Sequence, residues 1–214
     1  MWRPRLPQSE WQQAAARFTR EDGNRWEFRE TVPDPWQTVI DGLRFELRLT
    51  DFGHVGVFPE HALTWRWLNR PGLAAPAGGA APSLLNLFAY SGGATLAAVR
   101  AGFRVCHLDA AQKMVAWGAR NAALNGMAAA PVRWIADDAQ KFLRREERRG
   151  SRYDAVILDP PSFGRGTRQE LFKIDNHLLD LVGLCRGVLG ATPRFVLLSC
   201  HTPGYTPLVL RHVL

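Results

Sequence analysis

The sequence predicts an α/β protein with a doubly wound, mostly parallel sheet. Between residues 83 and 199, short apolar stretches alternate with longer segments of mixed polarity, and short loops join them. Glycines follow three of the longer segments, as they often do at the carboxyl ends of helices. Alternation of this kind is typical of strands and crossover helices that build a parallel sheet.

The N-terminal part of the chain has a different pattern. Residues 1–35 are polar and aromatic without a clear period, and we expect irregular structure there. In residues 45–49 apolar side chains alternate with charged ones, which predicts a half-buried strand. A turn at 51–53 then leads to a returning strand at 54–58 and to a short helix at 61–70.

Residues 71–79 are rich in proline, glycine and alanine and are a linker by composition. We therefore divide the chain into two parts. Residues 1–80 form an N-terminal region with a β-hairpin extension and a short helix, and residues 81–214 form the α/β domain.

The α/β domain contains five apolar stretches of strand length and four intervening helical patterns. The predicted strands are 83–88, 104–109, 132–136, 153–158 and 194–199. The predicted helices are 93–100, 111–125, 140–149 and 169–188.

Composition restricts the class of protein. Hydrophobic residues make up 46% of the 214, which is enough for a full core. No apolar run reaches the roughly 18 residues that a membrane span needs, and the N-terminus lacks an apolar signal core, so we expect a cytoplasmic protein with no membrane contact. The three cysteines are widely spaced and match neither a disulfide framework nor a zinc motif, so we expect no metal.

The formal net charge is +7, and arginine supplies almost all of the positive charge. The planar guanidinium group makes paired hydrogen bonds with phosphate, which favours a nucleic-acid partner. A codon bias toward arginine and alanine in a GC-rich genome would give the same composition. The oligomeric state cannot be predicted from these features.

A glycine-rich turn follows the first strand of the α/β domain. It contains Tyr90, Ser91, Gly92 and Gly93 and opens the next helix. Glycine allows a ligand to approach the backbone, and the start of a helix exposes unpaired N–H groups. The turn is therefore a candidate ligand loop.

Carboxylates close the next two strands. Asp109 ends the second strand, where a carboxylate can accept hydrogen bonds from both hydroxyls of a ribose. Asp137, Asp138 and Ala139 close the third strand, where a carboxylate could accept from an adenine amino group. Asp109 and Asp138 could instead be N-caps of the helices that follow them, and Asp138 could do both.

Together these features predict an adenosine-type ligand across the first three strands. A nicotinamide dinucleotide would fit the same geometry, but the turn lacks the G-x-G-x-x-G spacing that seats a pyrophosphate. Asp159, Pro160 and Pro161 follow the apolar run 153–158 directly. The two prolines end the strand and stiffen the turn, so Asp159 should project rigidly at the edge where ligands bind in such sheets.

With these residues in view, the chain from about residue 41 onward resembles the class I S-adenosylmethionine-dependent methyltransferases, and within them the bacterial 23S rRNA methyltransferases and their uncharacterised relatives. The matching stretches are Leu87–Gly93, Val105–Asp109, Asp137–Ala139, Asp159–Gly164 and Asn121–Gly126. The resemblance implies a Rossmann-like fold, S-adenosylmethionine as cofactor and ribosomal RNA as partner. It implies cofactor contacts from Phe88, Tyr90, Ser91, Gly92, Gly93, Asp109, Ala110, Asp137, Asp138, Ala139 and Asp159.

The resemblance also exposes two departures. That fold has seven strands, the last two forming a hairpin, and the sequence ends at Leu214 inside the helix that should precede them, so we expect those strands to be missing. The segment from Gly56 to His61 resembles the β extension of the group. Glu60, His61 and Ala62 stand where Asp-Gln-Arg is more usual.

The resemblance makes Asp159, Pro160 and Pro161 the catalytic loop, in which Asp159 orients a nucleobase edge or takes part in proton transfer. Cys200 ends the fifth strand beside His201, and in the 5-methylcytosine branch of the group a cysteine there attacks the ring, so Cys200 is a candidate nucleophile with His201 as its base. Methylation of an amine is also possible, although Ser162 separates the prolines from Phe163.

The kind of acceptor stays open at the level of sequence. The chain could methylate a small molecule or a protein in place of RNA, or it could bind the cofactor without turnover. Four residues just past the catalytic loop are the candidate RNA contacts: Arg165, Gly166, Thr167 and Arg168.

Overall fold

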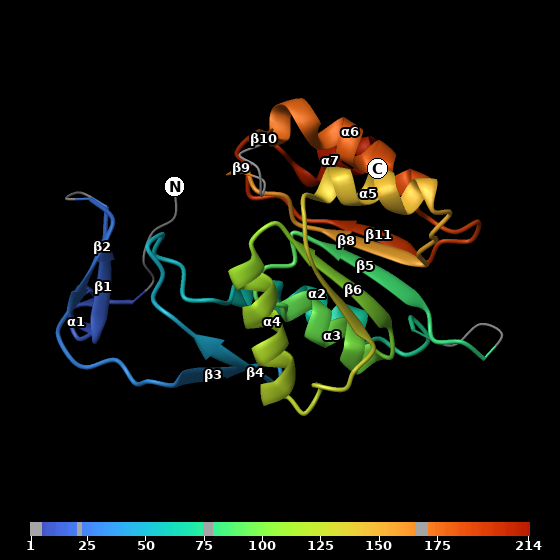
Figure 1. Cartoon of the computed structure of the whole chain (residues 1–214). Coiled ribbons are helices and arrows are strands. Elements are labelled where there is room, and N and C mark those ends of the chain that lie inside the picture. Colours follow the sequence, from blue (N-terminus) through green and yellow to red (C-terminus); the bar gives the residue numbers. More distant parts are fainter. Residues whose placement is uncertain (1–5, 21–22, 75–78, 166–170) are drawn as a thin grey trace.

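A computed structural model describes residues 6–20, 23–74, 79–165 and 171–214 of the chain. Its centre is a five-stranded sheet in which all neighbouring strands run parallel, in the order β11-β8-β5-β6-β7 (Figure 1). The strands are β5 (Ser83–Leu87), β6 (Arg104–Asp109), β7 (Val132–Ala136), β8 (Ala155–Leu158) and β11 (Phe195–Leu198). This arrangement confirms the predicted doubly wound α/β fold.

Helices cover both faces of the sheet (Figure 1). Because side chains alternate along a strand, Leu84 and Ile157 face one core with Leu96 and Phe103, while their neighbours on the strands face a second core. The helices of the first face are α2 (Ala62–Leu68), α3 (Gly93–Ala101) and α4 (Gln112–Leu124). The helices of the second face are α5 (Ala139–Arg148) and α6 (Ile174–Gly187).

An antiparallel hairpin of β3 (Trp36–Ile40) and β4 (Leu43–Leu47) lies beside α4. Leu43 and Phe45 are buried in the same core as residues of β5 and α3, so this core extends across the position that divides the two predicted parts. The predicted hairpin was wrong in its pairing, because β4 pairs with the strand before it. Residues 54–58 form no strand, and the turn before them is closed by hydrogen bonds from the Arg48 N–H to the Val55 carbonyl and from the Thr50 N–H to the His54 carbonyl.

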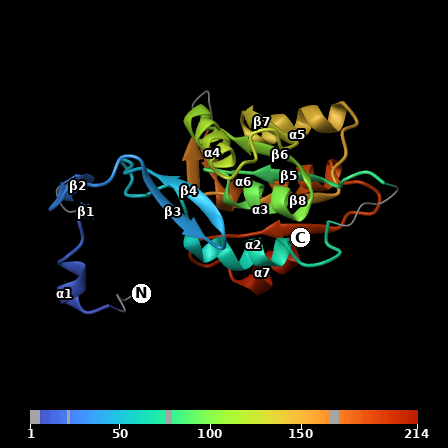
Figure 2. The same cartoon turned by 90° about the horizontal axis from the view of Figure 1, so that it is seen from below.

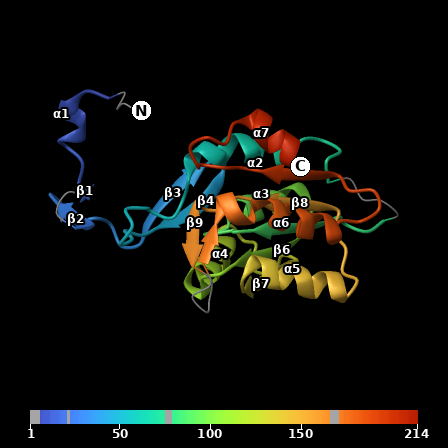
Figure 3. The same ribbon diagram turned by 90° about the horizontal axis from the view of Figure 1, so that it is seen from above.

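The first residues were predicted to be irregular, and this prediction was wrong. They form α1 (Gln8–Trp11) and a hairpin of β1 (Ala16–Thr19) and β2 (Arg25–Phe28), which stands apart from the sheet (Figures 2 and 3). The rings of Phe18 and Trp26 lie 5.2 Å apart, and Trp26 donates a hydrogen bond to the Thr50 carbonyl at 2.8 Å. The ring contact lies within the hairpin, and the hydrogen bond to Thr50 attaches the hairpin to the loop after β4.

The segment after β8 also differs from the prediction. A short antiparallel pair, β9 (Phe163–Arg165) and β10 (Leu171–Lys173), precedes α6, so the helix begins at Ile174 and not near residue 169. Of the predicted RNA contacts, residues 166–168 lie outside the described part of the chain. A 3-10 turn, η1 (Pro59–His61), precedes α2, and α7 (Pro207–Val213) follows β11. No helix in the described residues is both long and apolar enough to cross a membrane.

Candidate active site at the carboxyl ends of the strands

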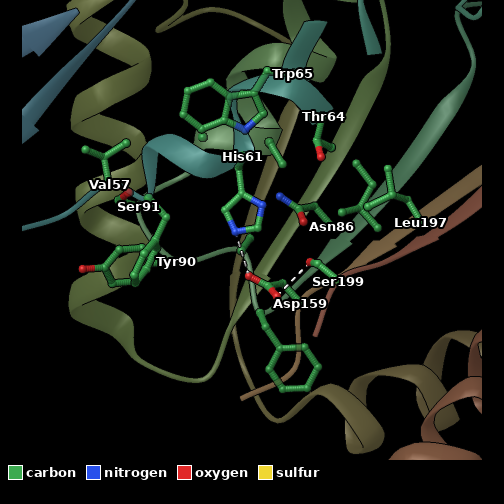
Figure 4. Close-up of a pocket in the computed structure, with 16 residues that line it drawn as sticks. Val57, His61, Thr64, Trp65, Asn86, Tyr90, Ser91, Asp159, Leu197 and Ser199 are labelled. Carbon is green, nitrogen blue, oxygen red and sulfur yellow. Dashed lines mark hydrogen bonds and ion pairs between the residues drawn. The ribbon is translucent and has the colours of Figure 1, made fainter. Parts of the chain in front are cut away.

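Two adjoining pockets lie where β5, β6, β8 and β11 end. The inner pocket is bounded by α2 and the start of α3 and is lined by His61, Thr64, Trp65, Asn86, Ser91 and Ser199 among others (Figure 4). The outer pocket is lined by Asp109, Ala110, Asp138, Ala139, Gln140 and Pro161 among others. Phe58, Phe88, Tyr90 and Asp159 line both pockets. The two pockets therefore share one rim.

The loop after β5 forms the floor between the two pockets. Phe88 and Tyr90 have positive φ angles of 56° and 50°, which large side chains rarely adopt and which cost about 1–3 kcal/mol each. Gly92 has a φ of 92°, and a Cβ there would lie 3.3 Å from the Gly118 Cα. A Cβ on Gly93 would lie 2.5 Å from the Trp65 ring. Close packing within the chain thus requires glycine at both positions, while the approach of a ligand to this backbone stays a prediction.

Asp109 holds this loop from the end of β6. Its Oδ2 accepts a hydrogen bond from the Tyr90 N–H at 2.9 Å, and its Oδ1 accepts from the Ala111 N–H at 2.9 Å. Burial raises the pKa of the Asp109 carboxyl, while these two backbone hydrogen bonds oppose the rise. The residue that caps α4 is Ala111, so Asp109 is not the N-cap of this helix.

The three residues after β7 have different surroundings. Asp138 is the N-cap of α5, since its Oδ1 accepts from the Lys141 N–H at 2.9 Å, and it also lines the outer pocket. Ala139 lines the same pocket. The Asp137 carboxylate accepts from the Asp138 N–H and pairs with Arg145, and Asp137 is not among the described residues that line either pocket.

Sequence reasoning missed Gln140, which lines the outer pocket beside Ala139. Its Nε2 is buried and has no hydrogen-bond partner among the described residues. A buried amide without a partner costs about 1–3 kcal/mol, so it indicates a place where a ligand can accept a hydrogen bond. A polar residue in the first turn of a helix is too common for the sequence alone to single it out.

Asp159 lies at the common rim, as predicted for the Asp-Pro-Pro loop. Ser199 donates a hydrogen bond to Oδ1 at 2.8 Å, and the His61 Nε2 lies 3.3 Å from Oδ2 (Figure 4). The His201 Nε2 lies 3.2 Å from Oδ1. Burial alone would raise the pKa of the Asp159 carboxyl, but the polar contacts with His61 and Ser199 and the nearby His201 lower it overall. Asp159 is therefore an anion at neutral pH, and it raises the pKa of His61.

The other predicted catalytic residues have different positions. Pro161 lines the outer pocket, and Pro160 is buried. Cys200 is half-buried and is not among the described residues that line either pocket. The imidazole of His201, which was predicted to serve Cys200, contacts Asp159.

His61 and Ser199 were not among the predicted site residues. The segment from Gly56 to His61 was expected to resemble a β extension that departs from the usual Asp-Gln-Arg, and η1 brings His61 onto Asp159. Ser199 could have been found, because β11 is the parallel neighbour of β8, so the residue after Leu198 lies beside the residue after Leu158.

Comparison with known proteins supports the fold and identifies the family. The family model of the S-adenosylmethionine-dependent methyltransferases matches residues 9–192. Among solved structures, a SAM-dependent methyltransferase from Agrobacterium tumefaciens is 39% identical, with a TM-score of 0.88, over 100% of this chain and 68% of that one. A second solved structure, a methyltransferase complexed with SAH, is 20% identical, with a TM-score of 0.76, over 89% of this chain and 48% of that one. At this level of identity, the similarity supports only the fold of this chain.

Curated relatives include two proteins named ribosomal RNA large subunit methyltransferase K/L. The one from Syntrophotalea carbinolica is 33% identical over 73% of this chain and 22% of its own length. The one from Shewanella baltica is 30% identical over 74% of this chain and 21% of its own length. The chain thus spans about a fifth of the length of these relatives. Its match to the family model over most of its length shows that it belongs to the S-adenosylmethionine-dependent methyltransferases.

Proposed function

We propose that the chain transfers a methyl group from S-adenosylmethionine to a base of ribosomal RNA. The observation that carries the proposal is the shared rim, where one carboxylate, Asp159, borders both the pocket suited to the nucleoside part of the cofactor and the pocket suited to its methionine part, which is where the sulfonium methyl group would lie. The curated relatives named for large-subunit rRNA and the formal net charge of +7 support RNA as the acceptor. An rRNA substrate would also locate the chain in the cytoplasm.

The polar groups of the outer pocket suit an adenosine. Asp109 supplies a rigidly held carboxylate that can accept from ribose hydroxyls, with Ala110 beside it. Asp138 offers an acceptor, and Gln140 offers a donor that has no partner among the described residues; these match the amino group and a ring nitrogen of adenine. The outer pocket thus offers both hydrogen-bond donors and hydrogen-bond acceptors, so its residues fit the nucleoside part of the cofactor.

The inner pocket suits the amino-acid part of the cofactor. The loop residues Phe88, Tyr90, Ser91 and Gly93 line it, and Gly92 permits their close packing against α4. His61 and Asp159 provide one potential cation and one anion to an otherwise uncharged lining. This pairing is complementary to the carboxylate and ammonium groups of a methionine moiety.

The bound cofactor supplies an electrophilic methyl group on a sulfonium centre. Methyl transfer is a displacement for which the protein mainly provides position and electrostatics. Asp159, kept anionic by Ser199 and two histidines, can accept a hydrogen bond from a base edge or receive a proton from it. Pro160 and Pro161 hold the carboxylate in place, because neither can rotate about φ.

The acceptor base has to be single-stranded or flipped out of a helix to reach Asp159. Phe163 is 52% exposed on β9, next to the outer pocket, and an exposed aromatic ring there can stack on a base. We propose Arg165 and Arg168, which follow the catalytic loop in the sequence, as phosphate contacts. Cys200 remains a candidate nucleophile for a cytosine acceptor. In the described part of the chain, no hydrogen bond joins its thiol to Asp159 or to His201.

The test is transfer of labelled methyl from S-adenosylmethionine to total RNA from cells with undermodified ribosomes, with protein and small-molecule fractions measured in parallel. We expect label in large-subunit rRNA, with a rate that falls steeply as salt is raised. Label confined to the protein fraction or to the small-molecule fraction would show that the acceptor is of that kind and is not RNA. Cofactor binding without label in any fraction would indicate a binder without turnover.

A further inference from the structure

Three side chains from separate elements converge at the rim of the two pockets. His61 ends η1, Asp159 follows β8, and His201 lies after β11. One ligand atom from each, two imidazole nitrogens and a carboxylate oxygen, lies within 4.8 Å of the other two. The sequence gives no sign of this cluster, since none of the three residues is close to another in the chain.

The separations between each imidazole nitrogen and the carboxylate match those between ligands in a coordination shell. Zinc binds imidazole nitrogen and carboxylate oxygen at about 2.0–2.2 Å, so two ligands of a tetrahedral ion are separated by about 3.3–3.5 Å. The His61 Nε2 lies 3.3 Å from Asp159 Oδ2, and the His201 Nε2 lies 3.4 Å from the same oxygen. These separations exceed the usual distance of about 2.9 Å in an N–H···O hydrogen bond.

His61 adds a second observation. Its Nε2 is buried and makes no hydrogen bond of normal geometry with any described residue, although it faces the Asp159 carboxylate. A buried imidazole nitrogen that points at a carboxylate without a proper hydrogen bond is suited to accept a cation between the two. The imidazole of His201 stacks beside the Phe58 ring, with ring centroids 6.4 Å apart and ring planes 28° apart.

We propose that His61, Asp159 and His201 form a binding site for a divalent cation of the zinc class. Two imidazoles and one carboxylate are a ligand set that zinc and neighbouring transition metals favour over magnesium, which prefers oxygen ligands. The open coordination position faces the pockets, because His61 lines the inner pocket, His201 the outer one and Asp159 both. An ion there engages the carboxylate that the proposed function uses, so metal occupancy would inhibit methyl transfer.

The test is cobalt binding to the full-length, metal-free chain, followed by its visible absorption, with zinc added as competitor. We expect one cobalt per chain with the intense bands of four- or five-coordinate geometry, and displacement of cobalt by zinc. His61→Asn and His201→Asn should each weaken cobalt binding at least tenfold. His54→Asn is the matched control, because this exposed histidine lines the outer pocket outside the cluster. Cys200→Ser tests the neighbouring thiol, and both controls should bind cobalt as the unaltered chain does.

The binding readout does not depend on the proposed function, so failure of one leaves the other standing. Absence of stoichiometric binding by the unaltered chain would overturn the inference, as would binding that survives both histidine substitutions. Loss of binding in Cys200→Ser would contradict the assigned ligands. If His61→Asn fails to fold, as judged by circular dichroism, the His201→Asn result decides, since that side chain is 54% exposed.

Discussion

Asn121 donates a hydrogen bond from its side-chain amide to the Ser91 carbonyl at 2.9 Å. Its Oδ1 accepts from the Glu46 N–H at 2.8 Å, and the side chain is fully buried. One residue of α4 therefore ties the hairpin strand β4 to the loop that forms the pocket floor. Asn125, one turn further along, bonds both the N–H and the carbonyl of Arg44 and attaches only the hairpin.

We expect Asn121→Ala to lower the free energy of unfolding by about 2–4 kcal/mol, because two buried backbone groups lose their partners. It should also weaken S-adenosylhomocysteine binding, since the Ser91 loop is released. Asn125→Ala should destabilise the chain by about 1 kcal/mol, because its partners can reach water, and leave the ligand affinity unchanged. Urea unfolding and calorimetric titration check both variants. Equal ligand affinities in the two variants would refute the link between Asn121 and the loop.

Asp109→Asn should reduce the affinity for S-adenosylhomocysteine by about ten- to a hundredfold. An amide can accept only one of the two backbone hydrogen bonds, and its NH₂ group would then face an N–H donor, at a cost of about 1.5–3 kcal/mol. Asp137→Asn is the matched control, because that carboxylate faces Arg145 and should change the affinity by less than about twofold. Isothermal titration measures the affinity of both variants for S-adenosylhomocysteine. A larger loss of affinity in Asp137→Asn than in Asp109→Asn would show that Asp137, and not Asp109, supports the bound ligand.

Glu146 should make stability depend on pH. Burial alone would raise the pKa of this carboxyl, but the hydrogen bond from Tyr153 and the pairing with Arg133 lower it below its usual 4.5. A carboxyl with a lowered pKa stabilises the folded state above the unfolded-state pKa, and this contribution disappears as the pH falls through the folded-state pKa.

Glu146→Gln should therefore lower the free energy of unfolding by about 1–3 kcal/mol at neutral pH, and by progressively less as the pH falls below about 4.5. Urea denaturation across this pH range measures the difference. Glu147→Gln, exposed on the same helix, should change stability by no more than about 0.5 kcal/mol. A deficit in Glu146→Gln that stays constant into acid would show that the charge of Glu146 is not the source.

Gly93→Ala should destabilise the chain by about 1–3 kcal/mol and weaken ligand binding, because the added methyl group meets the Trp65 ring. Gly183→Ala in α6 is the control, since among the described residues no other side chain or distant backbone lies within 4 Å of its added Cβ. It should stabilise the chain by up to about 1 kcal/mol through helix propensity. Thermal unfolding distinguishes the two, and a neutral Gly93→Ala would mean that Trp65 moves aside at no cost.

Much of the site follows from the sequence because parallel strands end at one edge of a sheet. Asp109, Asp138 and Asp159 each close an apolar strand, so their proximity was predictable. The role of Asp137 could not be predicted, because two adjacent carboxylates after a strand look alike in the sequence. Only the packing of α5 decides which of the two pairs with Arg145. The position of His61 depends on how η1 and α2 pack over the sheet, which no local pattern encodes.

The N-terminal errors have local causes. Asp41 and Gly42 are a two-residue hairpin turn with φ angles of 52° and 74°, and this signal predicts the β3–β4 pairing better than the turn at 51–53 does. The strands β1 and β2 are four residues each, too short for alternation to stand out. Their pairing is supported by Trp26, whose partner Thr50 lies in a different part of the chain.

The most direct test of the account is methyl transfer to large-subunit rRNA by Asp159→Asn, measured beside the unaltered chain under single-turnover conditions. Asparagine retains the shape and the hydrogen bond to Ser199 but removes the negative charge, so we predict a loss of at least about a hundredfold in rate, about 2.7 kcal/mol in activation free energy. Transfer by Asp159→Asn at the rate of the unaltered chain would contradict the placement of the reaction at this carboxylate.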